Sequence, residues 1–310
     1  MDLRQIEYIV QIADECSITK AAEKMFISQS GMNQQLLKLE AELGTPLFHR
    51  CKNNLRLTEA GKVYVDYGRQ ILHLKKEAYD ILNDIADNKA GSLSIGLTPE
   101  RGINMLMSVY PEFHQRFPHI TIEPQEISVR RQQSLISKGY LDLGFVTLNE
   151  ADKTGDEYIH IYYEDILLAV PRRHPLARNA TPPGTPFAVA DLRDFKDEYF
   201  VLMFKNSTMR SVIDPLFEES GFMPKLLFET ASNLTMCNLV KNNMACSLLT
   251  FNYAQEQEDV AYFYLPQRPR WELCATYKKE HYLTQAARTF IALAIDHYRN
   301  TALKIGQPVL

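Results

Sequence analysis

The stretch MFISQSGMNQQLLKLEAELG, residues 25–44, begins with small uncharged polar residues and continues with regularly spaced leucines. On a helical wheel, one face gathers large apolar residues within an arc of ~60°, and we expect this face to meet a core: Met32, Leu36, Leu39 and Leu43. A second face carries short hydroxyl and amide side chains, those of Ser30, Asn33 and Gln34.

The polar face has the chemistry of a helix that reads DNA. Asn and Gln side chains can bind adenine in the major groove with two hydrogen bonds, and serine can bind bases or phosphate. Ser28 is the expected N-cap, Gln29 lies in the first turn, and a helix N-terminus attracts phosphate. The alternative is a merely solvated face, although such faces usually carry Lys and Glu.

Two shorter helices are expected before this one. Asp2 with Gln5 forms a start like a capping box, and Ser17 is a plausible N-cap for the second helix. The turn at residues 26–27 then leads into the polar helix. Two helices joined by a short turn, the second with an exposed polar front, indicate a helix-turn-helix.

A basic segment follows, HRCKNNLRLTEAGK at residues 49–62. Against one acid, Glu59, it has four basic residues: Arg50, Lys52, Arg56 and Lys62. The whole chain has a net charge of −4, so nucleic-acid binding would depend on such local charge. The segment predicts a hairpin wing that grips phosphates, with a chance surface cluster as the alternative.

One long helix is expected from Thr58 to about Asn88. It would form a rod of roughly 45 Å. We favour dimerisation through its apolar stripe, because nothing before it is large enough to cover it; a helix lying on its own domain is the alternative. The stripe repeats at spacings of three and four residues: Tyr64, Tyr67, Ile71, Leu74, Ala78, Ile81 and Ile85.

From Leu93 onward, short β-rich runs alternate with helical patterns at about 100–117, 128–139, 208–220 and 232–243. This alternation predicts parallel sheets with crossover helices. About 210 residues exceed the needs of one small sheet, so two α/β lobes with a cleft between them are expected.

The composition narrows the class of protein. The 310 residues contain no apolar run near the ~20 residues of a membrane span, and the N-terminus lacks the pattern of a secretory signal. Five scattered cysteines favour neither a disulfide framework nor a zinc site, and the simplest compartment is a reducing cytoplasm. No cofactor, metal ligand set or catalytic arrangement can be read from the sequence.

The segment SITKAAEKMFISQSGMNQQLLKLEAELGTPLFHR (residues 17–50), followed by LTEAGK (57–62), resembles the N-terminal signature of LysR-type transcriptional regulators. Weaker similarity continues through GSLSIGLT, FPHITIE, GYLDLGFV and HPLA, in the order expected for that family's effector domain. The resemblance implies a winged helix-turn-helix, a long linker helix, and an α/β effector domain of two Rossmann-like lobes similar to periplasmic binding proteins.

The resemblance also implies boundaries for these parts. The DNA-binding domain would span residues 1–58, the dimerising linker helix 59–89 and the effector domain 90–310. Within the effector domain, lobe I would comprise about 90–163 and 267–310, and lobe II about 164–266.

Family positions for DNA contact match the recognition helix and the wing; they fall on Ser28, Gln29, Ser30, Asn33, Gln34, Arg50, Lys52, Asn53 and Arg56. Two of them depart from the family pattern. Gln34 stands where Arg is most frequent, and Asn33 where Ser is frequent. Losing that charge should weaken the grip on phosphate and shift the preference toward adenine.

Effector contacts are expected where strands end and helices begin; the candidates are Thr98, Arg101, Ser128, Thr147, Lys205, Ser207, Thr208 and Ser232. Simple helix capping is the alternative for the hydroxyls. Arg101 and Lys205 would favour a carboxylate effector. Asn243 replaces a family glycine, and we expect it to be left-handed.

The expected function is ligand-modulated binding of promoter DNA as a homodimer or homotetramer, with RNA polymerase as a further partner and no membrane. A constitutive DNA-binding regulator and a solute-binding protein on the same scaffold are the alternatives. Cys237 and Cys246 fall outside the segment that carries the redox switch of the family's peroxide sensors, which disfavours a redox role.

Overall fold

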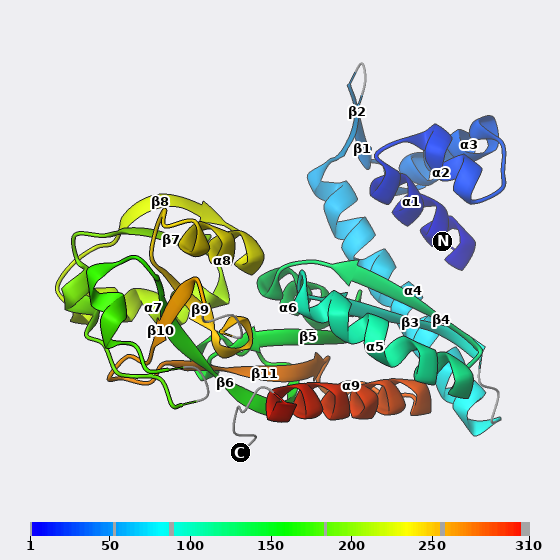
Figure 1. The fold of residues 1–310 in the computed structure, drawn as a ribbon. Coiled ribbons are helices and arrows are strands. Elements are labelled where there is room, and N and C mark those ends of the chain that lie inside the picture. The colour runs from blue at the N-terminus through cyan, green and yellow to red at the C-terminus, as the bar shows by residue number, and fades with distance from the viewer. Residues whose placement is uncertain (1, 52–53, 87–89, 183–184, 255–257, 305–310) are drawn as a thin grey trace. The chain divides into compact units, whose positions relative to one another are not determined.

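A computed structural model describes residues 2–51, 54–86, 90–182, 185–254 and 258–304 (Figure 1). The chain divides into two compact units. The N-terminal unit is made of Met1–Asn88 with Lys138–Tyr140, and the C-terminal unit of Lys89–Ser137 with Leu141–Leu310. No helix in the described ranges is both long and apolar enough to cross a membrane.

The N-terminal unit begins with three helices, α1 (Leu3–Glu15), α2 (Ile18–Lys24) and α3 (Gln29–Leu43). Each of the three predicted N-caps is confirmed. The Asp2 carboxylate accepts a hydrogen bond from the backbone N–H of Gln5 at 2.7 Å. Ser17 accepts from Lys20 at 3.3 Å and Ser28 from Gly31 at 3.1 Å. These bonds satisfy N–H groups that have no partner within their own helix.

The hairpin and the long helix follow as expected. Strands β1 (Phe48–Cys51) and β2 (Asn54–Leu57) pair antiparallel, with Phe48 opposite Leu57. Helix α4 (Glu59–Ile85) begins after Thr58, whose hydroxyl donates to the carbonyl of Pro46 at 2.8 Å and accepts from the N–H of Gly61 at 2.9 Å. Thr58 therefore ties the start of α4 to the chain before the hairpin.

The core of this unit lies between α1, α2, α3 and α4. Met32, Leu36 and Leu39 are buried, as predicted. Leu43 is 43% exposed, so its predicted core position is wrong. It is the last residue of α3, because Gly44 in the left-handed conformation (φ 68°) ends the helix there.

Helix α4 packs on α1 through small residues. A Cβ atom added at Gly68 would lie 2.9 Å from Cγ2 of Ile6. At Gly61 it would lie 2.0 Å from the carbonyl oxygen of Leu47, closer than any real contact. Helices α1 and α4 and the segment just before β1 can approach one another only because these positions lack side chains.

Part of the predicted apolar stripe of α4 packs on its own domain, and part stays exposed and available for dimerisation. Tyr64 and Ile71 pack against the core of their own unit, as the alternative predicted. Tyr67, Leu74 and Ile85 remain 64%, 61% and 76% exposed. The stripe is thus wider than one contact surface, and part of it stays exposed among the described residues.

The C-terminal unit contains a seven-stranded sheet in its described part, in the order β10-β6-β11-β5-β3-β4, with β9 also paired to β6. Its strands are β3 (Ala90–Leu97), β4 (His119–Glu126), β5 (Leu143–Leu148), β6 (Glu157–Pro171), β9 (Ser247–Thr250), β10 (Val260–Phe263) and β11 (Arg270–Tyr277). A separate parallel pair consists of β7 (Tyr199–Met203) and β8 (Lys225–Thr230).

Helices cover these sheets: α5 (Arg101–Arg116), α6 (Val129–Ser137), α7 (Thr208–Glu219), α8 (Asn233–Lys241) and α9 (Gln285–Lys304). Short 3₁₀ turns are η1 (Glu150–Asp152), η2 (Pro175–Asn179), η3 (Leu192–Phe195) and η4 (Phe251–Tyr253). The four predicted helical patterns match α5 to α8 within a few residues. Strand β11 and helix α9 were not among the predicted elements. Asn243 has the left-handed φ of 59° that was predicted for it.

The prediction of parallel sheets with crossover helices is confirmed for β3, β4 and β5 and for β7 with β8, and it is wrong for β6 and β11. Strand β3 does pair parallel with β4 and β5, each through a crossover helix. Strand β11 instead runs antiparallel to both β5 and β6, and β6 runs antiparallel to β9 and β10. The β-rich pattern of a strand gives its burial but not its direction, which depends on partners distant in sequence.

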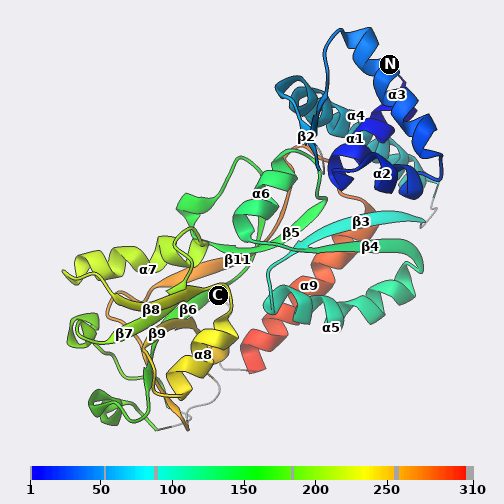
Figure 2. The ribbon, with the colours of Figure 1, turned by 90° about the horizontal axis from the view of Figure 1, so that it is seen from above.

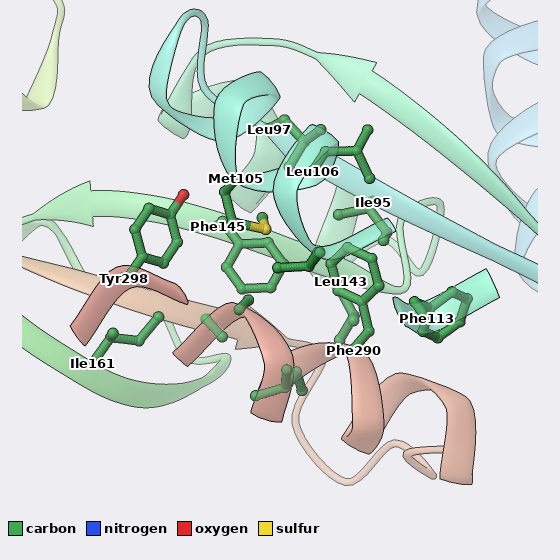
Figure 3. Close-up of a cluster of buried hydrophobic side chains, with 14 of the residues drawn as sticks. Ile95, Leu97, Met105, Leu106, Phe113, Leu143, Phe145, Ile161, Phe290 and Tyr298 are labelled. Carbon is green, nitrogen blue, oxygen red and sulfur yellow. The ribbon is translucent and has the colours of Figure 1, made fainter. Parts of the chain in front are cut away.

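Two strands connect two separate cores (Figure 2). Strand β6 places Ile161 in the first core and Ile166 in the second, and β11 places Leu273 in the first and Trp271 in the second. We call the parts around these cores lobe I and lobe II. In lobe I, the ring of Phe290 from α9 meets Phe113 edge to face at 5.3 Å and lies 5.9 Å from Phe145 (Figure 3).

The close packing at Gly61 gives a direct test. We expect Gly61→Ala to destabilise the N-terminal unit by about 2 kcal/mol or more, because the added methyl overlaps the Leu47 carbonyl and the helix must shift. Urea unfolding followed by circular dichroism measures the change. Gly155→Ala is the control, since a Cβ there meets nothing within 4 Å. Equal stability of the two variants would contradict the packing described.

Candidate DNA interface and ligand cleft

The polar face of α3 is exposed at its N-terminal end. Ser28, Gln29, Ser30 and Gln34 are exposed, and Asn33 is half-buried. The Ser28 hydroxyl oxygen, which caps the helix, also lies 3.2 Å from that of Ser30. Since the opposite face carries the buried Met32, Leu36 and Leu39, the core packing fixes the direction in which the amides point. The result is a preformed row of neutral hydrogen-bonding groups.

Phe26, directly before this helix, was not singled out from the sequence. Its side chain is 95% exposed and its φ of 54° is unusual for a bulky residue. Met25 and Ile27 on either side pack against the core, and the N–H of Phe26 donates to the carbonyl of Glu23 at 3.2 Å. The turn is therefore held rigidly with an aromatic ring at the edge of the polar face.

The wing residues are described only in part. Arg56 is exposed on β2, opposite His49 of β1, which is also exposed. Arg50 lies on β1, but its side chain is outside the described residues, as are Lys52 and Asn53 altogether. The basic position that the structure places on this hairpin surface is therefore Arg56.

A cleft of about 260 Å³ opens between the lobes of the C-terminal unit. Five of the eight predicted effector residues line it: Thr98, Arg101, Ser128, Thr147 and Thr208. Further lining residues were not predicted; they include Pro99, Arg130, Met203, Asn206, Met209, Asn233 and Trp271. Met203 and Met209 come from a predicted strand and a predicted helix, where the sequence gives no sign of which face meets the cleft, and Trp271 comes from β11, a strand that was not predicted.

Lys205, Ser207 and Ser232 are not among the lining residues. Ser207 accepts from the N–H of Arg210 at 3.3 Å and Ser232 from that of Thr235 at 3.1 Å, so both cap helices, as the alternative interpretation predicted. Lys205 is exposed. A role in effector binding for these three stays a prediction.

A buried ion pair lies beside the cleft. Arg101, on the first turn of α5, places its guanidinium 2.5 Å from the carboxylate of Glu164, whose side chain is fully buried. Glu164 also accepts from the indole N–H of Trp271 at 3.0 Å and the backbone N–H of Asn252 at 3.1 Å. Burial by itself would lower the pKa of Arg101, but the nearby Glu164 carboxylate raises that pKa above its usual value.

This pairing changes the expectation for Arg101. The predicted role was to attract a carboxylate effector. Its positive charge is already balanced by Glu164, so Arg101 contributes hydrogen-bonding groups and position more than net charge.

Several hydrogen bonds cross from one lobe to the other. The Thr208 hydroxyl donates to the carbonyl of Thr147 at 2.7 Å. Arg130 of α6 donates from Nε to the carbonyl of Asn206 at 2.9 Å. On another side, the Glu100 carboxylate accepts from lobe II hydroxyl groups. The cleft is therefore bounded by contacts that would have to break for the lobes to separate.

Cys237 and Cys246 are buried free thiols. Burial raises the pKa of Cys246 to about 12, and it also raises the pKa of Cys237. Since the thiolate is the reactive form, these buried thiols are poor targets for oxidation. Within the described ranges no group of three or more His, Cys, Asp and Glu side chains could hold a metal ion.

A winged helix-turn-helix joined to a two-lobed domain with a cleft defines a class of protein, the ligand-responsive transcriptional regulators. Comparison with known families agrees. A profile described as bacterial regulatory helix-turn-helix protein, lysR family, matches residues 3–62, and the LysR substrate binding domain matches residues 86–299. The chain belongs to the LysR family.

Similarity to known transcriptional regulators extends over most of the chain. YcgK of Bacillus subtilis (strain 168), an uncharacterized HTH-type transcriptional regulator, is 27% identical over 97% of this chain and 96% of its own. A probable RuBisCO transcriptional regulator of Emiliania huxleyi is 32% identical over 79% of this chain and 76% of its own.

Solved structures share the fold. CbnR complexed with its target DNA aligns with a TM-score of 0.62 at 23% identity, covering 97% of this chain and 100% of that one. A full-length variant of OxyR from Pseudomonas aeruginosa aligns at 0.69 and 20% identity, covering 96% and 98%. As a member of the LysR family, the protein is a DNA-binding transcriptional regulator with an effector-binding domain rather than an enzyme.

The buried ion pair supplies a prediction for stability. Arg101→Met should lower the midpoint of thermal unfolding by about 10 °C, because it leaves the buried Glu164 charge without a partner, at a cost of about 3–5 kcal/mol. Adding Glu164→Gln to the same chain should restore much of the loss. Arg193→Met is the control, since the Arg193–Asp191 pair is largely exposed and such pairs contribute less than about 1 kcal/mol. Similar midpoints for the two single variants would show that the pair is not essential.

Proposed function

We propose that this regulator reads promoter DNA with the exposed face of α3, grips phosphates with its wing, dimerises through α4, and responds to a small molecule bound between its lobes. The working division is residues 1–58 for DNA binding, 59–89 for the linker and 90–310 for the effector domain. Within it we assign about 90–163 and 267–310 to lobe I and about 164–266 to lobe II.

The observation that carries the proposal is the exposed polar end of α3. Gln29, Asn33 and Gln34 present amides that can bind adenine, with Ser28 and Ser30 placed for phosphate or a base edge. Arg56 is assigned to phosphate, and Arg50, Lys52 and Asn53 are assigned with it because they occupy the same hairpin. The neutral amide of Gln34, at a position where the family most often has Arg, shifts the balance from phosphate attraction toward base reading.

These roles separate in one binding experiment on the full chain. Gln34→Ala should weaken binding to the selected operator by about 1–3 kcal/mol while leaving binding to random DNA unchanged. Arg56→Ala, the matched control, should weaken binding to both the operator and random DNA. It should also make the negative slope of log K against log salt shallower by about 0.9. Fluorescence anisotropy over a range of salt concentrations, on a site selected from random sequences, measures both.

Either assignment can fail independently. If Gln34→Ala weakens all DNA sequences equally, the residue does not read bases. If Arg56→Ala leaves the salt slope unchanged, that side chain does not contact phosphate.

The uncovered part of the α4 stripe supports dimerisation. Tyr67, Leu74 and Ile85 are spaced seven and eleven residues apart, so they lie along one side of the helix and form a seam for a second copy. A homotetramer would need a second surface. Strand β4 ends the sheet order, and among the described residues its outer edge has no partner strand, so it offers an edge for this surface.

Substitution within the seam tests the dimer. Leu74→Glu should shift the protein from dimer or tetramer toward smaller species, because it places a charge in an apolar contact. Sedimentation velocity at micromolar concentration measures the distribution. Tyr79→Glu is the control, since Tyr79 is also 61% exposed but lies on another side of α4. An unchanged distribution for Leu74→Glu would remove the seam from the interface.

The cleft is the proposed effector site, with Thr98, Arg101, Ser128, Thr147 and Thr208 as contacts. Its volume suits a small organic molecule, since a 150 Å³ cavity holds benzene. A carboxylate remains the chemical class that converging helix N-termini would favour. A regulator of this kind would act in the cytoplasm on promoter DNA and RNA polymerase. The constitutive alternative would leave the cleft without a regulatory ligand.

A further inference from the structure

We propose that Glu100 is a positioning residue of the effector cleft: its side chain clasps lobe I to lobe II and thereby sets how readily the cleft opens. This inference rests on the proposed effector role of the cleft. It concerns a residue that does not itself line the pocket but adjoins two that do, Pro99 and Arg101.

The clasp consists of two hydrogen bonds from one carboxylate. Oε1 of Glu100 accepts from the hydroxyl of Ser232 at 2.7 Å, and Oε2 accepts from the hydroxyl of Tyr253 at 2.7 Å. Glu100 lies at the N-terminus of α5 in lobe I. Ser232 caps α8 and Tyr253 ends η4, and both elements pack on lobe II. Hydrogen bonds to an ionised carboxylate are stronger than those between neutral groups.

The backbone at Glu100 is strained. Its φ of 61° and ψ of −73°, with the N–H of Arg101 donating to the carbonyl of Pro99 at 2.7 Å, form the rare and strained kind of γ-turn. A non-glycine residue keeps such a conformation only where surrounding contacts hold it. The two cross-lobe hydrogen bonds to the side chain are such contacts.

The strained backbone turn and the two cross-lobe hydrogen bonds belong to the same residue, Glu100. The turn that carries Glu100 also presents Thr98, Pro99 and Arg101 to the cleft. If the clasp releases, the turn can relax to an ordinary conformation, and these lining residues move with it. Closure of the lobes and the geometry of the effector contacts are thereby coupled through one residue.

The coupling has a consequence for effector binding. A ligand that needs the closed cleft binds more weakly in proportion to the time the cleft spends open. Glu100 therefore raises apparent effector affinity without touching the ligand, by keeping the closed state populated.

Hydrogen exchange measured by mass spectrometry on the full chain tests the clasp directly. In Glu100→Ala, amides in residues 98–105 and 231–236 should exchange about tenfold faster or more, the change expected from losing hydrogen bonds to a charged group. Amides of β5 and α9 in the lobe I core should be unchanged. Glu100→Gln, which can keep one acceptor and form a neutral bond, should restore part of the protection.

Tyr253→Phe removes one arm of the clasp and leaves the backbone of Glu100 intact. It should reproduce part of the effect at residues 98–105, on the opposite lobe. Tyr158→Phe is the matched control: its hydroxyl bonds Gln133 and Thr154, all within lobe I, so it should leave residues 231–236 unaffected.

Two outcomes would overturn the proposal. Unchanged exchange at both cleft segments in Glu100→Ala would show that the lobes are held without the clasp. Faster exchange spread equally through the β5 and α9 core would show a general role in stability. The measurement uses neither DNA nor effector, so a failure of the DNA-reading or ligand-response proposals would not alter its result.

Discussion

The C-terminal unit depends on the crossing of two strands from one core into another. Strands β6 and β11 are antiparallel there, and their register sets Trp271 opposite Glu164 at the passage between the lobes. Glu164 cannot remain charged and buried without partners, and it finds them in Arg101, in the Trp271 indole and in the Asn252 backbone. The turn η4 of lobe II, strands β6 and β11 and the first turn of α5 are thereby held together at one point.

Because of this arrangement, the shape of the cleft depends on contacts behind the lining residues as well as on the lining residues themselves. Thr98, Ser128 and Thr147, which line the cleft, sit where strands end, and their positions depend on contacts made by neighbouring residues. Arg101 is placed by Glu164, and Thr208 is bound to the carbonyl of Thr147 across the cleft. Charged groups here serve mostly to position neighbouring groups.

The N-terminal unit is held together instead by helix caps and by close packing at small residues. Ser28 and Thr58 each end an irregular segment and start a helix, and Gly61 and Gly68 let α4 approach the rest. Close packing fixes the direction of the α3 polar face, because a rotation of that helix would expose Met32 and bury amides without partners. The DNA reading proposed for this face therefore depends on apolar packing on the reverse side of the same helix.

The sequence by itself determined what local chemistry decides. Caps at Asp2, Ser17 and Ser28, the left-handed Asn243 and the buried stripe of α3 follow from groups a few residues apart, so they could be predicted. Only the tertiary structure decided three other features. They are the direction of β6 and β11, the burial of Arg101 against Glu164, and the hydrogen bond from the Ser232 hydroxyl to Glu100. These depend on partners more than sixty residues away, and a sequence pattern contains no information about which distant group will balance a buried charge or complete a sheet.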